Sequence, residues 1–298
     1  MDYIVRNKMI ETGETDNPLD EILYLLQQID LRVDCTLIQE THRQIGRFFS
    51  GSHPDFKPSN TKYHNLSHTY SVALATIRIF HGLYCEKQYF DPEIIEQGMV
   101  SAYFHDTGLL VAADDPETCG AKYTTTHEER SISFMNDYLA VRGVARSFRD
   151  HCADMVKCTN LGIEPDTLTF VSESHRLAGY IVGSADLLAQ MADRFYLERL
   201  PLLFQEMNEG GVNHYASAIV LMRETNNFYQ SVVRKRLEKK FRDLQQAMQT
   251  HFRERWNLDQ NLYVDNITKN INYIAKIISE NADTPARLPN YLRRNPPA

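Results

Sequence analysis

Apolar residues recur at spacings of three and four along most of the chain. One such stripe starts at His68 and continues through Val72, Ala75 and Ile79. Spacings of three and four place side chains on one face of an α-helix, whereas a half-buried strand alternates every second residue. No segment keeps such an alternation long enough to suggest a sheet. The sequence therefore predicts an all-α fold.

The chain of 298 residues contains no internal repeat and no low-complexity linker, which favours one all-α domain over residues 1–298. The predicted architecture is a multi-helix bundle. Proline should interrupt or restart a helix at Pro201, and residues 285–298, with four prolines, should form a disordered or draped tail. Helices are expected near 18–49, 66–84, 92–107, 127–139, 144–159, 174–191 and 225–256.

The composition excludes several classes of protein. With 32 basic and 39 acidic residues, the net charge of −7 argues against broad nucleic-acid binding and against an anionic membrane surface. It does not argue against a small anionic substrate. There is no apolar window of about 18 residues and no signal-peptide pattern. Five scattered cysteines without a CxxC pair favour reduced thiols and a cytoplasmic protein. GxGxxG, GxxxxGK[ST] and GxSxG fingerprints are absent.

Four places in the sequence put metal-binding side chains on inward-facing helical stripes. His68 heads the stripe described above. His105 and Asp106 both end small or apolar stripes, and Asp186 shares a face with glycines that allow a neighbouring helix to approach. His127 is expected in the first turn of a helix, where free backbone N–H groups favour an anion.

Buried histidines and carboxylates need partners, because each costs several kcal/mol when unpaired. A divalent metal would satisfy all of them together, since imidazole and carboxylate are its common ligands. The alternative is a buried polar network without a metal. Neither HxxxH nor HD is rare alone, so the prediction rests on their order and helical phase.

The ordered set of histidine, His-Asp and distant Asp resembles the HD-domain superfamily of metal-dependent phosphohydrolases. The YHNxxH string at residues 63–68 is similar to the signature of class I cyclic-nucleotide phosphodiesterases. The resemblance spans residues 63–206, the expected HD-type metal-binding core. A purine-clamping SQxGF-like string is absent after Asp186, which leaves both phosphodiester and phosphomonoester substrates open.

The resemblance implies a hydrolase in which activated water attacks phosphorus. It implies His64 as the general acid and Asp106 as a carboxylate shared between two metals. His127 would lie near the second metal or the phosphate, and Arg130 and Lys62 are candidates to bind phosphate, with a solvated surface charge as the alternative. The implied ligands of the first metal are His68, His105, Asp106 and Asp186.

The implied cofactor is one or two divalent ions per chain, from manganese, magnesium, iron, zinc or nickel. The implied partner is a small phosphorylated substrate such as a nucleotide. A homo-oligomer through the amphipathic segment at 225–256 stays open, although an internal core face is the commoner use of such a stripe.

Two other functions remain open from the sequence. Some HD-domain proteins are mixed-valent di-iron oxygenases, and the six ligands this requires would include His151 in addition to His68, His105, Asp106, His127 and Asp186. The other is a non-catalytic nucleotide-binding HD module.

Overall fold

The computed structural model describes residues 8–11, 17–281, 291–292 and 294. Every regular element in this part is helical, apart from an isolated antiparallel bridge between Phe56 and Ala112. The all-α prediction is therefore confirmed. The α-helices are α2 (Pro18–Ile29), α3 (Cys35–Ser50), α4 (Leu66–Cys85), α5 (Pro92–Phe104), α6 (His127–Val141), α7 (Arg146–Val156), α8 (Glu173–Ala192), α9 (Tyr196–Glu209), α10 (Ala218–Phe228), α11 (Ala247–Trp256) and α12 (Leu262–Glu280).

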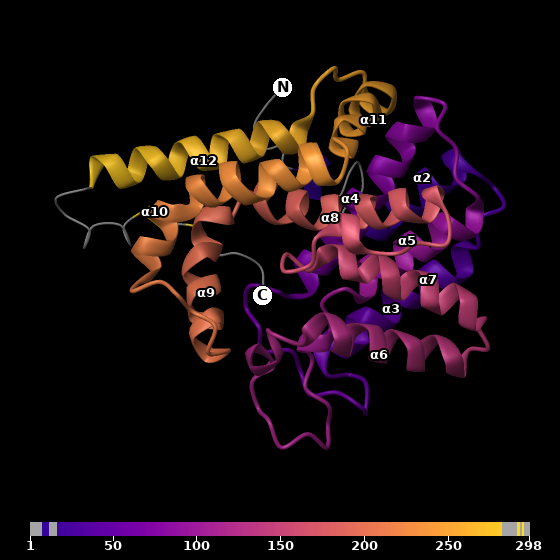
Figure 1. The fold of residues 1–298 in the computed structure, drawn as a ribbon, viewed down its shortest axis with the longest axis horizontal. Helices are drawn as coiled ribbons and strands as arrows, with labels where there is room; N and C mark the ends of the chain where they lie inside the picture. Colours follow the sequence, from indigo (N-terminus) through magenta and orange to yellow (C-terminus); the bar gives the residue numbers. More distant parts are fainter. Residues whose placement is uncertain (1–7, 12–16, 282–290, 293, 295–298) are drawn as a thin grey trace.

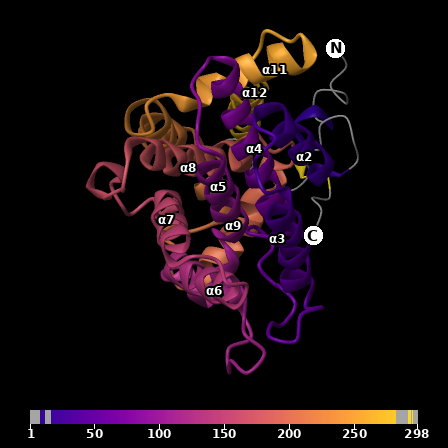
Figure 2. The ribbon, with the colours of Figure 1, turned by 90° about the vertical axis from the view of Figure 1, so that its right-hand side faces the viewer.

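Helix α4 is the central helix of the bundle. It packs against α2, α5, α8 and α11, and both views show it surrounded by other helices (Figures 1 and 2). Every residue from Val72 to Leu83 is buried. A helix that is buried on all sides lies inside the protein, although Arg78 and His81 interrupt the apolar surface of α4. Its first turn, which contains His68, is therefore joined directly to the core.

Helices α9, α10 and α12 form a group on the left of Figure 1, and α8 links this group to the rest of the bundle. Helix α9 continues through Pro201, so the predicted interruption at this proline is wrong. Proline removes the backbone donor to the carbonyl of Leu197. The helix persists because Tyr196, Leu197 and Leu200 bury their side chains in the core, and tertiary packing outweighs the lost bond.

The prediction of a single helix near 18–49 is also wrong, because α2 ends at Ile29 and α3 begins at Cys35. Asp30 accepts a hydrogen bond from the backbone N–H of Arg32, and Asp34 caps α3 by accepting from Thr36. Short acidic side chains that bind nearby backbone donors favour such breaks over a continuous helix.

The long helix expected over residues 225–256 is broken. Two π-helical turns, Tyr229–Val233 and Arg236–Lys240, follow α10, and Arg242 and Asp243 have left-handed backbone angles. The Arg236 guanidinium donates to the carbonyls of Asn160 and Ile163 at 2.7 and 2.9 Å. These long-range bonds fix a local backbone that the apolar stripe alone does not predict.

The predicted tail at 285–298 falls mostly outside the described residues. Of those described, Tyr291 and Leu292 pack against the core, and Arg294 pairs with the buried Glu198 at 2.9 Å. Among the described helices, none has the length and apolar character needed to cross a bilayer.

Helices α4 and α11 approach each other closely at Gly82. A Cβ atom there would collide with the carbonyl of Ala247, and backbone cannot move aside as a side chain can. We expect Gly82→Ala to lower the free energy of unfolding by about 2 kcal/mol, measured by urea denaturation.

Gly46→Ala is the matched control. A Cβ at Gly46 in α3 would meet only the Tyr70 hydroxyl oxygen, at 2.8 Å, which is the far end of a side chain and can be relieved by a small shift of the ring. The better helix propensity of alanine is worth about 1 kcal/mol, so stability should change little. Equal losses in both variants would contradict the close-packing argument.

Candidate metal centre

The first turn of α4 positions His64 and His68. Asn65 caps the helix by accepting a hydrogen bond from the backbone N–H of His68 at 3.1 Å. Thr61 donates its hydroxyl to the carbonyl of His64 at 2.7 Å. The polar string at 63–68 therefore forms a helix start, with His64 just outside α4 and His68 buried inside it.

His105 and Asp106 lie at the end of α5, which stops at Phe104, three residues earlier than the sequence predicted. His105 Nδ1 donates to the carbonyl of Ala102 at 2.8 Å, because a carbonyl can only accept. Burial would lower the pKa of His105, but Asp106 and Asp186 outweigh it and raise the pKa to about 9. In the neutral ring, the bond to Ala102 places the lone pair on Nε2, where it can bind a cation in place of the proton. The hydroxyl of Ser131 donates to the carbonyl of His105 at 2.6 Å and so joins α6 to this corner.

His127 is the first residue of α6 and points toward the same centre. Its Nδ1 donates to the carbonyl of Thr124 at 2.8 Å, which directs Nε2 toward the other side chains of the centre. That Nε2 lies 3.5 Å from Asp106 Oδ1. His68 and His105 face the other carboxylate oxygen, Oδ2.

Asp186 projects from the middle of α8. On the same face, a Cβ at Gly183 would come within 2.7 Å of the carbonyl of Cys158. The expected close approach beside Asp186 is thus present, and it comes from the turn Lys157–Thr159.

These side chains converge on one point. His68 Nε2 lies 3.1 Å from Asp186 Oδ1 and 3.3 Å from His105 Nε2. His105 Nε2 lies 3.1 Å from Asp106 Oδ2. Ligand atoms bound to one ion at 2.0–2.2 Å are roughly 3 to 3.5 Å apart, so these spacings match a shared cation. His68, His105 and Asp106 together form a group able to hold a metal.

Asp106 provides the clearest test of this fit. Its side chain is buried, and Oδ2 has no hydrogen-bond partner. Burial would raise the pKa of Asp106, but His105, His64 and His68 outweigh it and hold the pKa well below its usual range. A buried carboxylate oxygen that faces imidazole nitrogens without a well-aligned hydrogen bond suits a shared cation, so the residues present fit a metal ion.

Glu206 is a site residue that the sequence analysis missed. This buried carboxylate on α9 forms a short contact with His64 Nδ1 and accepts from the backbone N–H of Tyr63 at 3.1 Å. Burial would lower the pKa of His64, but Glu206, Asp106 and Asp186 outweigh it and raise the pKa to about 9. No local pattern marks Glu206, because its partner is 142 residues away.

A cavity of about 260 Å³ opens beside the cluster. His64, Asp106, His127 and Asp186 line it, together with Glu128, which was also missed. Glu128 Oε2 lies 3.3 Å from His127 Nδ1. The remaining wall comes from the turn after α7 and from the end of α8, and consists of Thr159, Asn160, Leu161, Gly162, Leu187 and Gln190.

Three other candidate residues lie outside this cavity. Arg130 donates to the carbonyls of Gly108 and Leu110 and stacks on Tyr123 at 3.5 Å. Lys62 is exposed. His151 contacts the amide of Gln97 at 3.3 Å and the ring of His175 at 4.3 Å between centroids. The two basic side chains therefore do not line the cavity in this structure, and His151 contacts none of the four clustered ligands.

A family model described as Npun_R2479-like matches residues 54–266. This range contains every residue of the cluster, as well as His64 and Glu206. No protein in the curated collection matches the sequence significantly.

We expect the purified chain to bind a divalent cation, and Asp106→Ala to lose it. Removing Asp106 takes away the carboxylate whose two oxygens face His105 and His127. Metal content per chain after equilibration with manganese, iron, zinc or nickel, measured by mass spectrometry, checks this.

His151→Ala is the matched control and should keep the wild-type metal content. The assignment is wrong if Asp106→Ala binds metal normally, or if His151→Ala loses it as completely.

Proposed function

The chain belongs to the Npun_R2479-like family, and we propose that it is a metal-dependent phosphohydrolase that cleaves a phosphoester of a nucleotide or a related small phosphate. The observation that carries this proposal is the shared cavity. His64, with a carboxylate behind it, faces the same space as Asp106 and Asp186. An acid beside a cation site is what phosphoester hydrolysis needs.

His68, His105, Asp106 and Asp186 would hold the ion. When bound, a divalent cation lowers the pKa of water and neutralises charge on the phosphate oxygens. The hydrogen bonds from His105 to Ala102 and from His127 to Thr124 fix the ring orientation of both histidines, so their Nε2 atoms are ready to bind.

The role of His64 is to protonate the leaving group. Its Nδ1 is bound to Glu206, which leaves Nε2 for a ligand in the cavity. The water first loses a proton to solvent, and the resulting hydroxide adds to phosphorus. The bond to the leaving oxygen then breaks, and His64 gives its Nε2 proton to that oxygen. Glu206 stabilises the protonated imidazole until the transfer and holds the ring in place.

The cavity walls favour a small substrate. At about 260 Å³, the cavity is slightly below the usual range for drug-sized ligands. Asn160 and Gln190 offer amide groups for the part of the substrate beyond the phosphate. The α6 N-terminus at His127 offers backbone donors and a positive dipole end, which suits a phosphate oxygen.

The oxygenase alternative finds less support. It needs six protein ligands, and His151 is engaged with Gln97 and His175 instead. Two irons per chain together with an oxygen-dependent reaction would favour it over hydrolysis.

The first test is turnover with each metal on phosphomonoesters, cyclic nucleotides and dinucleotides. We expect His64→Ala to keep its metal and to lose about 10² to 10⁴ in turnover, the usual contribution of a positioned acid. The loss should be larger for alkyl phosphoesters than for nitrophenyl esters, because nitrophenolate leaves without a proton. Equal losses on both substrates would contradict the role of His64 as an acid.

The pH–rate profile tests Glu206. The acid must be protonated, so activity falls as pH rises through the pKa of His64. Because the Glu206 carboxylate raises that pKa, Glu206→Gln should move the alkaline limb to lower pH. An unchanged limb, with metal content intact, would show that His64 is not the titrating acid.

A further inference from the structure

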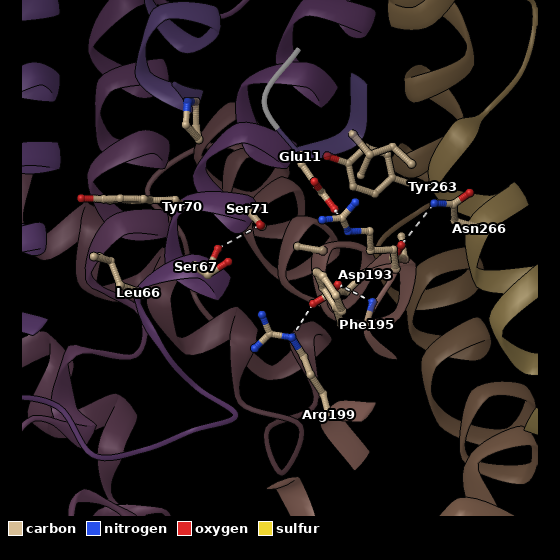
Figure 3. Close-up of a pocket in the computed structure, with 15 residues that line it drawn as sticks. Glu11, Leu66, Ser67, Tyr70, Ser71, Asp193, Phe195, Arg199, Tyr263 and Asn266 are labelled. Carbon is tan, nitrogen blue, oxygen red and sulfur yellow. Dashed lines mark hydrogen bonds and ion pairs between the residues drawn. The ribbon is translucent and has the colours of Figure 1, made fainter. Parts of the chain in front are cut away.

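A second cavity, of about 350 Å³, lies where the start of α4 meets the joint between α8 and α9 (Figure 3). Leu66, Tyr70 and Ala189 contribute apolar walls, and Arg199 enters from α9. None of the residues that line the metal-centre cavity lines this one. The pocket is therefore a separate site that the proposed phosphohydrolase chemistry does not use.

Arg199 is the residue that singles out this pocket. It is 5% exposed, and its Nε pairs with Asp193 Oδ2 at 2.5 Å. Nη1 is buried and has no hydrogen-bond partner. Figure 3 shows the guanidinium reaching from α9 up toward Asp193, among the pocket residues. A buried charged donor without an acceptor is costly.

In the other buried arginines among the described residues, terminal guanidinium nitrogens donate hydrogen bonds to backbone carbonyls. Arg236 Nη2 donates to the carbonyl of Asn160 at 2.7 Å, and Arg78 Nη1 donates to that of Ile10 at 2.8 Å. Both sets of bonds hold the fold together. Arg199 has only the ion pair between Nε and Asp193, and neither Nε nor Nη1 makes a well-aligned hydrogen bond. The outer edge of its fork therefore has no acceptor among the described residues.

The charges around Arg199 restrict the ligand. Asp193 already balances its charge, and Glu11 pairs with Arg194 at 2.8 Å on the same rim. Two nearby carboxylates would repel a dianion such as a phosphate monoester. A carboxylate carries one charge and matches the planar guanidinium fork. The apolar walls would cover an apolar body.

We propose that this pocket binds a small monocarboxylate with an apolar body, its carboxylate on the free edge of Arg199 and its body between α4 and α8. The pocket shares secondary-structure elements with the metal centre. Ser67, beside His68, lines it, and the Asp193–Arg199 pair joins the two helices that carry Asp186 and Glu206.

The probe is benzoate, titrated into the full-length chain by calorimetry. We expect Arg199→Met to weaken benzoate binding by about tenfold or more, as expected for a lost charge-assisted pair. Asp193→Asn should strengthen binding, because it frees the guanidinium charge. Asparagine keeps the side-chain oxygen that accepts from the backbone N–H of Phe195, so the start of α9 should survive.

The two variants remove the same ion pair, yet the proposal predicts opposite effects on benzoate. Weaker benzoate binding in both variants would mean that the substitutions act by disturbing the structure, and it would overturn the proposal. So would absence of binding to the wild type, unchanged binding in Arg199→Met, or tighter binding of phenyl phosphate than of benzoate.

Ser71→Leu tests the pocket while leaving the Asp193–Arg199 ion pair intact. It replaces Arg199→Met as the test if that variant fails to fold. Ser71 lines the pocket, and its hydroxyl bonds only within α4, to the carbonyl of Ser67 at 2.9 Å. A leucine there should fill the cavity and block benzoate, and undiminished binding would contradict the site. Asp106→Ala should bind benzoate as the wild type does. A parallel loss there would place benzoate at the metal centre instead.

Discussion

The structure of this site depends on the burial of Asp106. A carboxylate whose Oδ2 lies inside the bundle without a well-aligned hydrogen bond is stable only beside positive charge. Three histidines surround it, from the start of α4, the end of α5 and the start of α6. Imidazoles can supply that charge as protonated rings, or they can bind a cation that supplies it. The hydrogen bonds at Nδ1 of His105 and His127 suit the second arrangement.

The same helices that hold the core deliver these ligands. Helix α4 is buried along most of its length, so the position of His68 is fixed by packing rather than by the site. Close contact with α11 at Gly82 holds the far end of this helix. A ligand on such a rigid element loses little entropy when it binds a metal.

Much of this arrangement was visible in the sequence, because helical phase is a local property. The stripe below His68 and those ending at His105 and Asp106 predicted inward side chains, and all three are buried. Glu206 was not predicted because it pairs with a residue 142 positions away in the sequence, which no local pattern reveals. The breaks near Asp30 and Arg242 were missed for a similar reason: side-chain bonds to backbone, several of them long-range, decide the local conformation there.

The most direct measurement of the central claim is anomalous diffraction from crystals of the chain grown with manganese, recorded on both sides of the manganese absorption edge. We expect one strong peak within bonding distance of His68, His105, Asp106 and Asp186. Any second peak should lie between Asp106 and His127. A map without a peak among these four side chains, at full manganese loading, would contradict the proposed metal centre.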